Sequence, residues 1–187
     1  MKQPKVLLVS LSPSSDSFGE EGKFRFSIFQ RRPFIGLYYL SSALENAGYS
    51  SEVLCQHGGN FKLPDLIEKI SCQEYLFLGI YIQFIGKEKT IRYISEIKKN
   101  LPHIKIIAGG PGYIEYEDFL NAGADIVCAG EAEETIVEVA DALSKNSDIT
   151  SIKGIHYILD EKYSLVLSGS LLKTWTPLAF PIGVRLI

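Results

Sequence analysis

The stretch that decides the fold runs from Lys105 to Leu143 and reads KIIAGGPGYIEYEDFLNAGADIVCAGEAEETIVEVADAL. Within it, a short apolar run at 105–108 and a second one at 125–129 each stop at glycine. Each run is followed by a segment with helical spacing of apolar residues, 114–122 and 131–143, whose first turns carry carboxylates that suit the helix dipole. Two successive strand–turn–helix units indicate a parallel sheet. Their glycine turns are expected at its carboxyl edge, where ligands bind.

The rest of the chain repeats this alternation. Apolar runs typical of strands lie at 5–11, 51–56 and 75–82, and amphipathic segments typical of helices lie at 33–47, 63–70 and 87–100. Strands that alternate with helices predict an α/β fold with helices on both faces of a parallel sheet. We therefore predict a three-layer Rossmann-like or flavodoxin-like domain with five parallel strands in the order 2-1-3-4-5.

The pattern changes near residue 148. Segments 152–159 and 163–168 alternate like a β-hairpin, and 171–187 is expected to form an extended tail. We accordingly divide the chain into a Rossmann-like unit, 1–148, and a hairpin with its tail, 149–187.

Composition narrows the possible function classes. The 187 residues are 46% hydrophobic and 22% charged, as in ordinary globular proteins. A formal net charge of -3 offers no basic face for nucleic acid, and no apolar run is long enough to cross a bilayer. The three cysteines, Cys55, Cys72 and Cys128, are too widely spaced for a disulfide framework or a metal knuckle. These features predict a cytoplasmic protein that binds neither nucleic acid nor membrane.

Familiar catalytic signatures do not occur. The chain has no Gly-x-Gly-x-x-Gly after its first strand and no P-loop, and no serine or cysteine has an evident base partner. We expect the histidines, His57, His103 and His156, on the surface. The acidic residues that open segment 131–143 could be paired carboxylates, metal ligands or helix N-terminal charges worth ~0.3–1 kcal/mol each. Glu131 differs because it stands beside a glycine at the expected crevice, where it could accept a hydrogen bond from a ligand amide.

A long loop at 12–32 carries serines and phenylalanines. Loops of this length in compact domains are often functional. Its serines could bind a ligand and its rings could cover an apolar pocket, or the rings could simply pack the loop onto the body.

Six short motifs occur in a set order: RPFIGLYYL at 32–40, LGIY at 78–81, GGP at 109–111, ADIV at 124–127, GEAEET at 130–135 and IKGIHY at 152–157. Together they resemble the cobalamin-binding domain of cobalamin-dependent radical S-adenosylmethionine enzymes, over nearly the whole chain. The resemblance implies cobalamin as the cofactor. The corrin ring would lie on the carboxyl edge of the sheet and the dimethylbenzimidazole tail inside the body. It also implies a cobalt without a histidine ligand and a methyl group passed from cobalt to a substrate.

The chain agrees in lacking the Asp-x-His-x-x-Gly signature that supplies a histidine ligand in other cobalamin proteins. A corrin is wide and largely apolar, with a fringe of amides, and so it suits glycine turns, aromatic walls and scattered hydrogen-bonding groups. We predict no catalytic residue and no protein ligand to a metal. The predicted cofactor contacts are Ser10, Ser12, Tyr81, Gln83, Phe84, Gly109, Gly110, Pro111, Gly130, Glu131, Glu133 and Thr135.

Two departures from the family pattern stand out. Ala132 takes the place of the family's third glycine, and the Cys-x-x-x-Cys-x-x-Cys that binds an iron–sulfur cluster does not occur. We therefore expect no such cluster in this chain, and a radical S-adenosylmethionine catalytic domain in cis, if the chain is part of a larger enzyme, or in trans. Two alternatives stay open: a cofactor-free relative that acts as an interaction module through its tail, and a flavodoxin-like domain that binds another nucleotide or acts in signalling.

Overall fold

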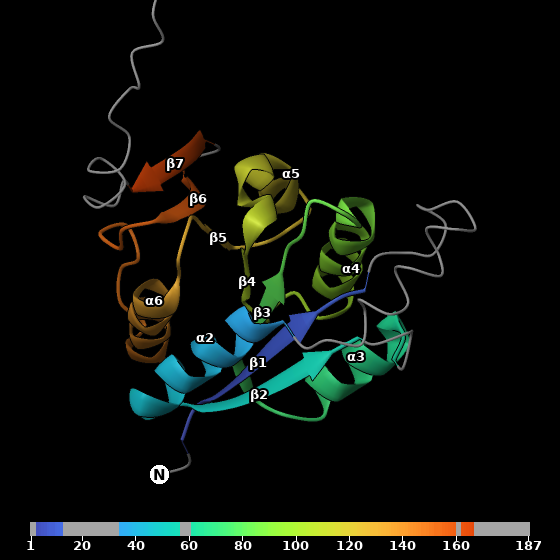
Figure 1. Cartoon of the computed structure of the whole chain (residues 1–187), viewed down its shortest axis with the longest axis horizontal. Coiled ribbons are helices and arrows are strands. Elements are labelled where there is room, and N and C mark those ends of the chain that lie inside the picture. Colours follow the sequence, from blue (N-terminus) through green and yellow to red (C-terminus); the bar gives the residue numbers. More distant parts are fainter. Residues whose placement is uncertain (1–2, 13–33, 57–60, 160–161, 167–187) are drawn as a thin grey trace, which may run out of the picture.

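A seven-stranded sheet organises the part of the chain that the structure describes (Figure 1). The computed structural model describes residues 3–12, 34–56, 61–159 and 162–166. Sheet order is β2-β1-β3-β4-β5-β6-β7. The strands are β1 (Lys5–Ser10), β2 (Ser50–Cys55), β3 (Tyr75–Tyr81), β4 (Ile106–Gly109), β5 (Ile126–Cys128), β6 (Ile155–Leu159) and β7 (Lys162–Val166).

The first five strands are parallel, which confirms the predicted fold class and the order 2-1-3-4-5. The predicted hairpin also forms. Strand β6 pairs antiparallel with β5, and β7 pairs antiparallel with β6. The hairpin therefore extends the same sheet. The predicted tail at 171–187 lies outside the described residues.

Helices cover both faces of the sheet (Figure 1). Helices α2 and α6 pack on one face, and α3, α4 and α5 pack on the other. Their bounds are α2 (Ile35–Asn46), α3 (Leu63–Ser71), α4 (Lys87–Asn100), α5 (Tyr116–Asn121) and α6 (Glu133–Lys145), and a 3₁₀ turn, η2 (Pro111–Glu115), precedes α5. Among the described residues, no helix is both long enough and apolar enough to cross a membrane.

Two predicted helices differ in detail from the observed ones. The segment expected as one helix at 114–122 is divided into η2 and α5. Helix α6 begins two residues later than predicted, so Glu131 lies in the turn before it. Ala132, at the helix start, has φ -115, which any residue can adopt.

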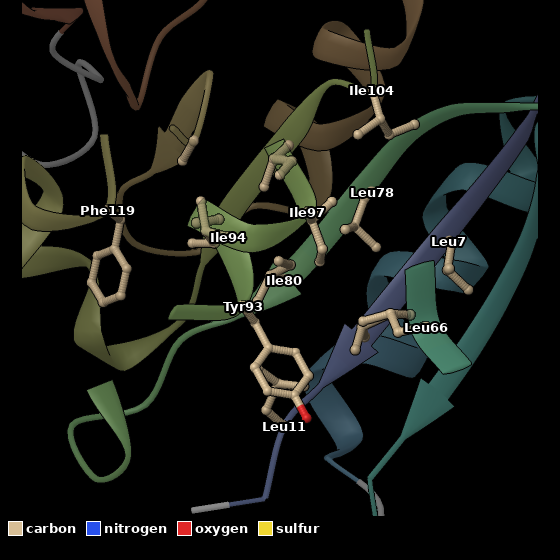
Figure 2. Packing of buried hydrophobic residues seen from close by; sticks show 14 of the residues in the cluster. Leu7, Leu11, Leu66, Leu78, Ile80, Tyr93, Ile94, Ile97, Ile104 and Phe119 are labelled. Carbon is tan, nitrogen blue, oxygen red and sulfur yellow. The ribbon is translucent and has the colours of Figure 1, made fainter. Parts of the chain in front are cut away.

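Each face of the sheet has its own hydrophobic core, because successive residues of a strand point to opposite faces. Leu7, Leu78 and Ile80 pack against α3 and α4, and Figure 2 shows this cluster together with Ile94 and Ile97 of α4. The opposite face is built from a second set of strand residues, among them Val6, Leu8, Phe77, Ile107 and Ile126.

The prediction that His156 lies on the surface is wrong. Its side chain is only 6% exposed, because β6 lies between β5 and β7 rather than at an edge. The imidazole stacks on the Tyr116 ring with the centroids 3.8 Å apart, and its Nδ1 atom has no hydrogen-bond partner. Burial lowers the pKa of His156. His103 is exposed as predicted, and His57 lies outside the described residues.

Candidate cofactor-binding site

An apolar cavity of about 210 Å³ lies between the carboxyl half of the sheet and helices α2 and α6. Three groups of residues line it: Gly36, Leu37 and Leu40 of α2; Leu8, Gly79, Ile80, Tyr81, Ile107, Ala108, Gly109, Gly110 and Cys128 of the strands and their ends; and Gly130, Glu131, Ala132, Glu133 and Ile136 at the start of α6. Most of these side chains are aliphatic or absent. The cavity therefore suits a flat, apolar group.

Two strand glycines make room for the cavity. Gly79 of β3 and Gly109 of β4 follow Phe77 and Ile107 by two residues, so their missing side chains would point to the α2/α6 face. A Cβ atom at Gly79 would lie 2.6 Å from Cδ2 of Leu8, and one at Gly109 would lie 3.4 Å from Cβ of Cys128. The floor of the cavity is therefore bare main chain, to which a ligand can approach closely.

An aromatic pair stands where β3 ends. The rings of Tyr81 and Phe34, the residue before α2, have centroids 4.9 Å apart. Gly110 allows the Tyr81 ring to lie against the backbone after β4. A Cβ atom there would come within 2.6 Å of the Ile82 carbonyl oxygen and 2.9 Å of Tyr81 Cε2, and its φ of 123 is one that favours glycine. Burial raises the pKa of Tyr81, so its hydroxyl stays protonated at neutral pH.

Among the described lining residues, the charged ones are Glu131, in the turn before α6, and Glu133, at the first position of α6. Glu131 is exposed and Glu133 is partly buried, while Cys128 is fully buried on the floor. Burial raises the pKa of the Cys128 thiol to about 12, which keeps it neutral and poorly nucleophilic. Among the described residues, no group of three or more His, Cys, Asp or Glu side chains could hold a metal ion.

The profile of the B12 binding domain matches residues 28–140, more than half of the chain. The chain belongs to this family. Vitamin B12 is cobalamin, so the match confirms the predicted cobalamin-binding domain and its cofactor. The match begins after β1 and ends within α6. It includes every residue that lines the cavity except Leu8 of β1.

Solved structures share the fold of this B12-binding domain. The radical S-adenosylmethionine methyltransferase TsrM from Kitasatospora setae is 19% identical with a TM-score of 0.69, over 88% of this chain and 30% of that one. The cobalamin-dependent S-adenosylmethionine radical enzyme OxsB, with aqua-cobalamin bound, is 17% identical with a TM-score of 0.74, over 89% of this chain and 22% of that one. The chain thus spans less than a third of either enzyme. No curated protein matches significantly in sequence.

A CheY-like protein, TadZ from Pseudomonas aeruginosa PAO1, is also similar in fold. It is 18% identical with a TM-score of 0.50, over 76% of this chain and 99% of that one. This match agrees with the flavodoxin-like strand order.

The cavity fits part of cobalamin rather than all of it. An apolar cavity of ~150 Å³ holds a benzene ring, so about 210 Å³ suits a flat bicyclic base. Drug-sized ligands need ~300 Å³ or more, so the cavity is too small for a corrin macrocycle. Apolar residues are exposed at that rim, including Phe84 after β3 and Ile114 after β4, which are 64% and 66% exposed.

Part of the predicted set of contacts lines the cavity of the B12-binding domain. The members that do so are Tyr81, Gly109, Gly110, Gly130, Glu131 and Glu133. Five of them lie at the carboxyl end of a strand or in the turn that follows, as the sequence indicated, and Glu133 is the first residue of α6.

The other predicted residues lie elsewhere along the rim or beside it. Ser10 is buried at the end of β1, and its Oγ atom has no hydrogen-bond partner. Gln83 donates from Nε2 to the Leu11 carbonyl oxygen at 3.2 Å, and Thr135 donates from Oγ1 to the Lys153 carbonyl oxygen at 3.4 Å. Ser12 donates its backbone N–H to Gln56 Oε1 at 3.2 Å, Phe84 is exposed, and Pro111 opens η2.

Several lining residues were not predicted. Leu37 and Leu40 of α2 look in sequence like an ordinary core-facing stripe. Gly79 did carry a signal, since a glycine inside an apolar strand often marks the close approach of another group. No sequence feature indicated that Cys128 faces a cavity.

Proposed function

We propose that this chain is the cobalamin-binding module of a radical S-adenosylmethionine-type methyltransferase or a related enzyme. The observation that carries the proposal is the apolar cavity floored by Gly79 and Gly109, open at the carboxyl edge of the sheet. In this proposal the dimethylbenzimidazole tail fills the cavity and the corrin lies across the rim. Bound cobalamin would supply a methyl group carried on cobalt, and the chain's own residues hold the cofactor.

Each part of the site has a role that follows from its chemistry. Leu37, Leu40 and Ile107 exclude water from the base through apolar contact. The main chain at Gly109 and Gly110 lets the tail approach without steric hindrance from side chains. The exposed carboxylate of Glu131 accepts hydrogen bonds from the corrin amides.

Cobalt is held without a protein histidine in this proposal. His103 lies before β4, at the amino edge of the sheet, opposite the cavity's open end. His156 points to the α5 side, where it stacks on Tyr116, and α5 covers the face without the cavity. Among the described residues, no histidine lines the cavity. His57 lies outside the described residues.

Methyl transfer needs a catalytic domain, which we propose acts in cis or in trans. The three cysteines of this chain do not form the motif that binds an iron–sulfur cluster. The chain spans 22–30% of TsrM and OxsB, which are radical S-adenosylmethionine enzymes. We also propose that the protein works in the cytoplasm, where its three thiols stay reduced.

The proposal is tested by loading purified protein with hydroxocobalamin, desalting it and recording the visible spectrum. We expect retained corrin absorbance in the native chain. Leu40→Trp should abolish retention, since Leu40 lines the cavity and an indole would fill it. Ser42→Trp is the matched control on the same helix at an exposed position, and it should retain the corrin. A colourless native protein would contradict the proposal and favour a cofactor-free interaction module.

A further inference from the structure

We infer that the cavity selects among corrinoids by the polarity of the nucleotide base. It accepts an apolar benzimidazole and discriminates against a purine such as adenine. This inference rests on the proposed function, because it requires the base to occupy the cavity between the sheet and helices α2 and α6.

Among the residues that the structure describes, those of the inner walls offer almost no hydrogen-bonding side chain. They are formed by aliphatic side chains, those of Leu8, Leu37, Leu40, Ile107 and Ile136, with Cys128 on the floor. A neutral thiol is a weak donor and a weak acceptor. Among the described lining residues, the polar side chains are those of Tyr81 at the end of β3, Glu131 in the turn before α6 and Glu133 at the first position of α6. Polar groups therefore stand at the open end, near the linker of the tail rather than its base.

The main chain of the floor is also committed to other partners. Strand β3 pairs with β4 from Leu78–Ile106 to Tyr81–Gly109, and β4 pairs with β5 from Ile107–Ile126 to Gly109–Cys128. Just beyond the strands, the Ile82 N–H donates to the Gly109 carbonyl oxygen at 2.8 Å, and the Ala129 N–H donates to the Gly154 carbonyl oxygen at 2.8 Å. The backbone of the floor thus offers a ligand close contact but few free hydrogen bonds.

Dimethylbenzimidazole and adenine are both flat bicyclic bases, but they differ in polarity. The outer edge of dimethylbenzimidazole carries two methyl groups, which gain free energy when they leave water for an apolar wall. Adenine presents an amino group and ring nitrogens on its outer edge. Burying such groups without partners is costly, and one or two unsatisfied groups should weaken binding by about 10- to 100-fold. The cavity therefore distinguishes bases that would fit equally well by shape.

The experiment measures the affinity of the native chain for three corrinoids by equilibrium dialysis, with corrin absorbance as the readout. The corrinoids are aquocobalamin, its analogue with an adenine base, and cobinamide, which has no nucleotide base. We expect aquocobalamin to bind most tightly, the adenine analogue about 10- to 100-fold more weakly, and cobinamide more weakly than aquocobalamin because it leaves the cavity unfilled.

Equal binding of aquocobalamin and the adenine analogue, both tighter than cobinamide, would overturn selection by polarity and leave the proposed function intact. Equal binding of all three would show that the base is not in the cavity. No binding of any corrinoid would overturn the proposed function itself.

A variant of α2 makes the test specific to the lining. Leu40→Gln adds an amide to the cavity wall at a partly buried position, where the fold should tolerate it. We expect the preference for aquocobalamin over the adenine analogue to fall several-fold. Ser42→Gln places the same amide on the exposed side of α2 and should leave the preference unchanged. A preference in Leu40→Gln equal to that of the native chain would contradict the inference.

Discussion

The two faces of the sheet differ most where the strands end. On the α3/α4/α5 face, Leu78, Ile80 and Ile94 fill the space between sheet and helices, and all are buried. On the α2/α6 face, strands β3 and β4 carry Gly79 and Gly109, and the cavity lies beside them. Because side chains alternate between faces, one strand can build a solid core on one side and a binding site on the other.

The polar side chains at the carboxyl edge also differ between the two faces of the sheet. On the solid face, Lys89 of α4 donates from Nζ to the Ser12 carbonyl oxygen and to Gln56 Oε1, both at 2.6 Å. Gln83 donates to the Leu11 carbonyl oxygen. These bonds tie the strand ends to one another. At the hollow face, the Glu131 carboxylate makes no side-chain hydrogen bond to the residues that the structure describes, and it remains available to a ligand.

The largest expected difference between the faces is in their response to truncation. Phe119→Ala removes a fully buried ring from the solid face and should lower the free energy of unfolding by ~3–5 kcal/mol. Leu40→Ala enlarges an existing cavity at a partly buried position and should cost less than ~2 kcal/mol. Urea denaturation of the cobalamin-free proteins measures both. Similar losses would mean that the faces are packed alike.

Gly110 allows the steric cost of an added Cβ atom to be separated from the cost of a positive φ angle. Gly110→Ala should cost ~2–3 kcal/mol, because its φ is 123 and a Cβ atom would lie 2.6 Å from the Ile82 carbonyl oxygen. Gly48→Ala is the matched control, since Gly48 has φ 90 but nothing within 4 Å of its Cβ position. It should cost ~1 kcal/mol. Thermal unfolding measures the stability of both variants. Equal losses of stability would mean that the close contact between residue 110 and the Ile82 carbonyl oxygen adds nothing to the cost of the backbone conformation.

The buried histidine should make stability depend on pH. Burial lowers the pKa of His156 below its ordinary value of 6.5. Between the lowered pKa and 6.5 the unfolded chain therefore binds more protons than the native chain, so stability is full above this range and falls as the pH decreases through it. The slope from this residue is at most ~1.4 kcal/mol per pH unit. His156→Phe should flatten the profile measured by urea denaturation between pH 5 and about 7, and His103→Phe, at an exposed position, should leave it unchanged.

The smallest expected effect concerns the charge at the open end. Glu131→Gln keeps a hydrogen-bond acceptor and should weaken cobalamin binding only ~2- to 5-fold, which corresponds to about 0.4–1 kcal/mol. Glu134→Gln, at an exposed position of α6 that does not line the cavity, should have no effect. Equilibrium dialysis provides the readout. A loss of tenfold or more in Glu131→Gln would mean that the carboxylate contributes more than one exposed hydrogen bond.

Local sequence patterns were sufficient for the sheet but only partly for the site. The apolar runs and the glycine turns after β4 and β5 predicted the strand order and the edge at which Gly109, Gly130 and Glu131 lie, because parallel strands bring their carboxyl ends together. The cavity itself depends on how far α2 stands from the sheet. Periodicity cannot give that distance, and so Leu40 looked like a core residue.

His156 shows a second limit. Alternation predicted the hairpin correctly, but the pairing of β6 with β5 is a contact between segments distant in sequence. That pairing buries the imidazole, and α5 supplies the Tyr116 ring on which it stacks. A histidine is intermediate in its tendency to be buried, so its own type could not decide the matter.

The central claim is that the cavity holds the nucleotide base away from cobalt and that no histidine replaces the base as a ligand to cobalt. Electron paramagnetic resonance of cob(II)alamin bound to the full chain tests this directly, because an axial nitrogen on cobalt(II) splits each cobalt line. We predict that the splitting seen for free cob(II)alamin disappears on binding. Persistent splitting that is unchanged in ¹⁵N-labelled protein would mean that the base still binds cobalt and the cavity is empty. Splitting that changes with the label would reveal a histidine ligand, and either result would contradict the account.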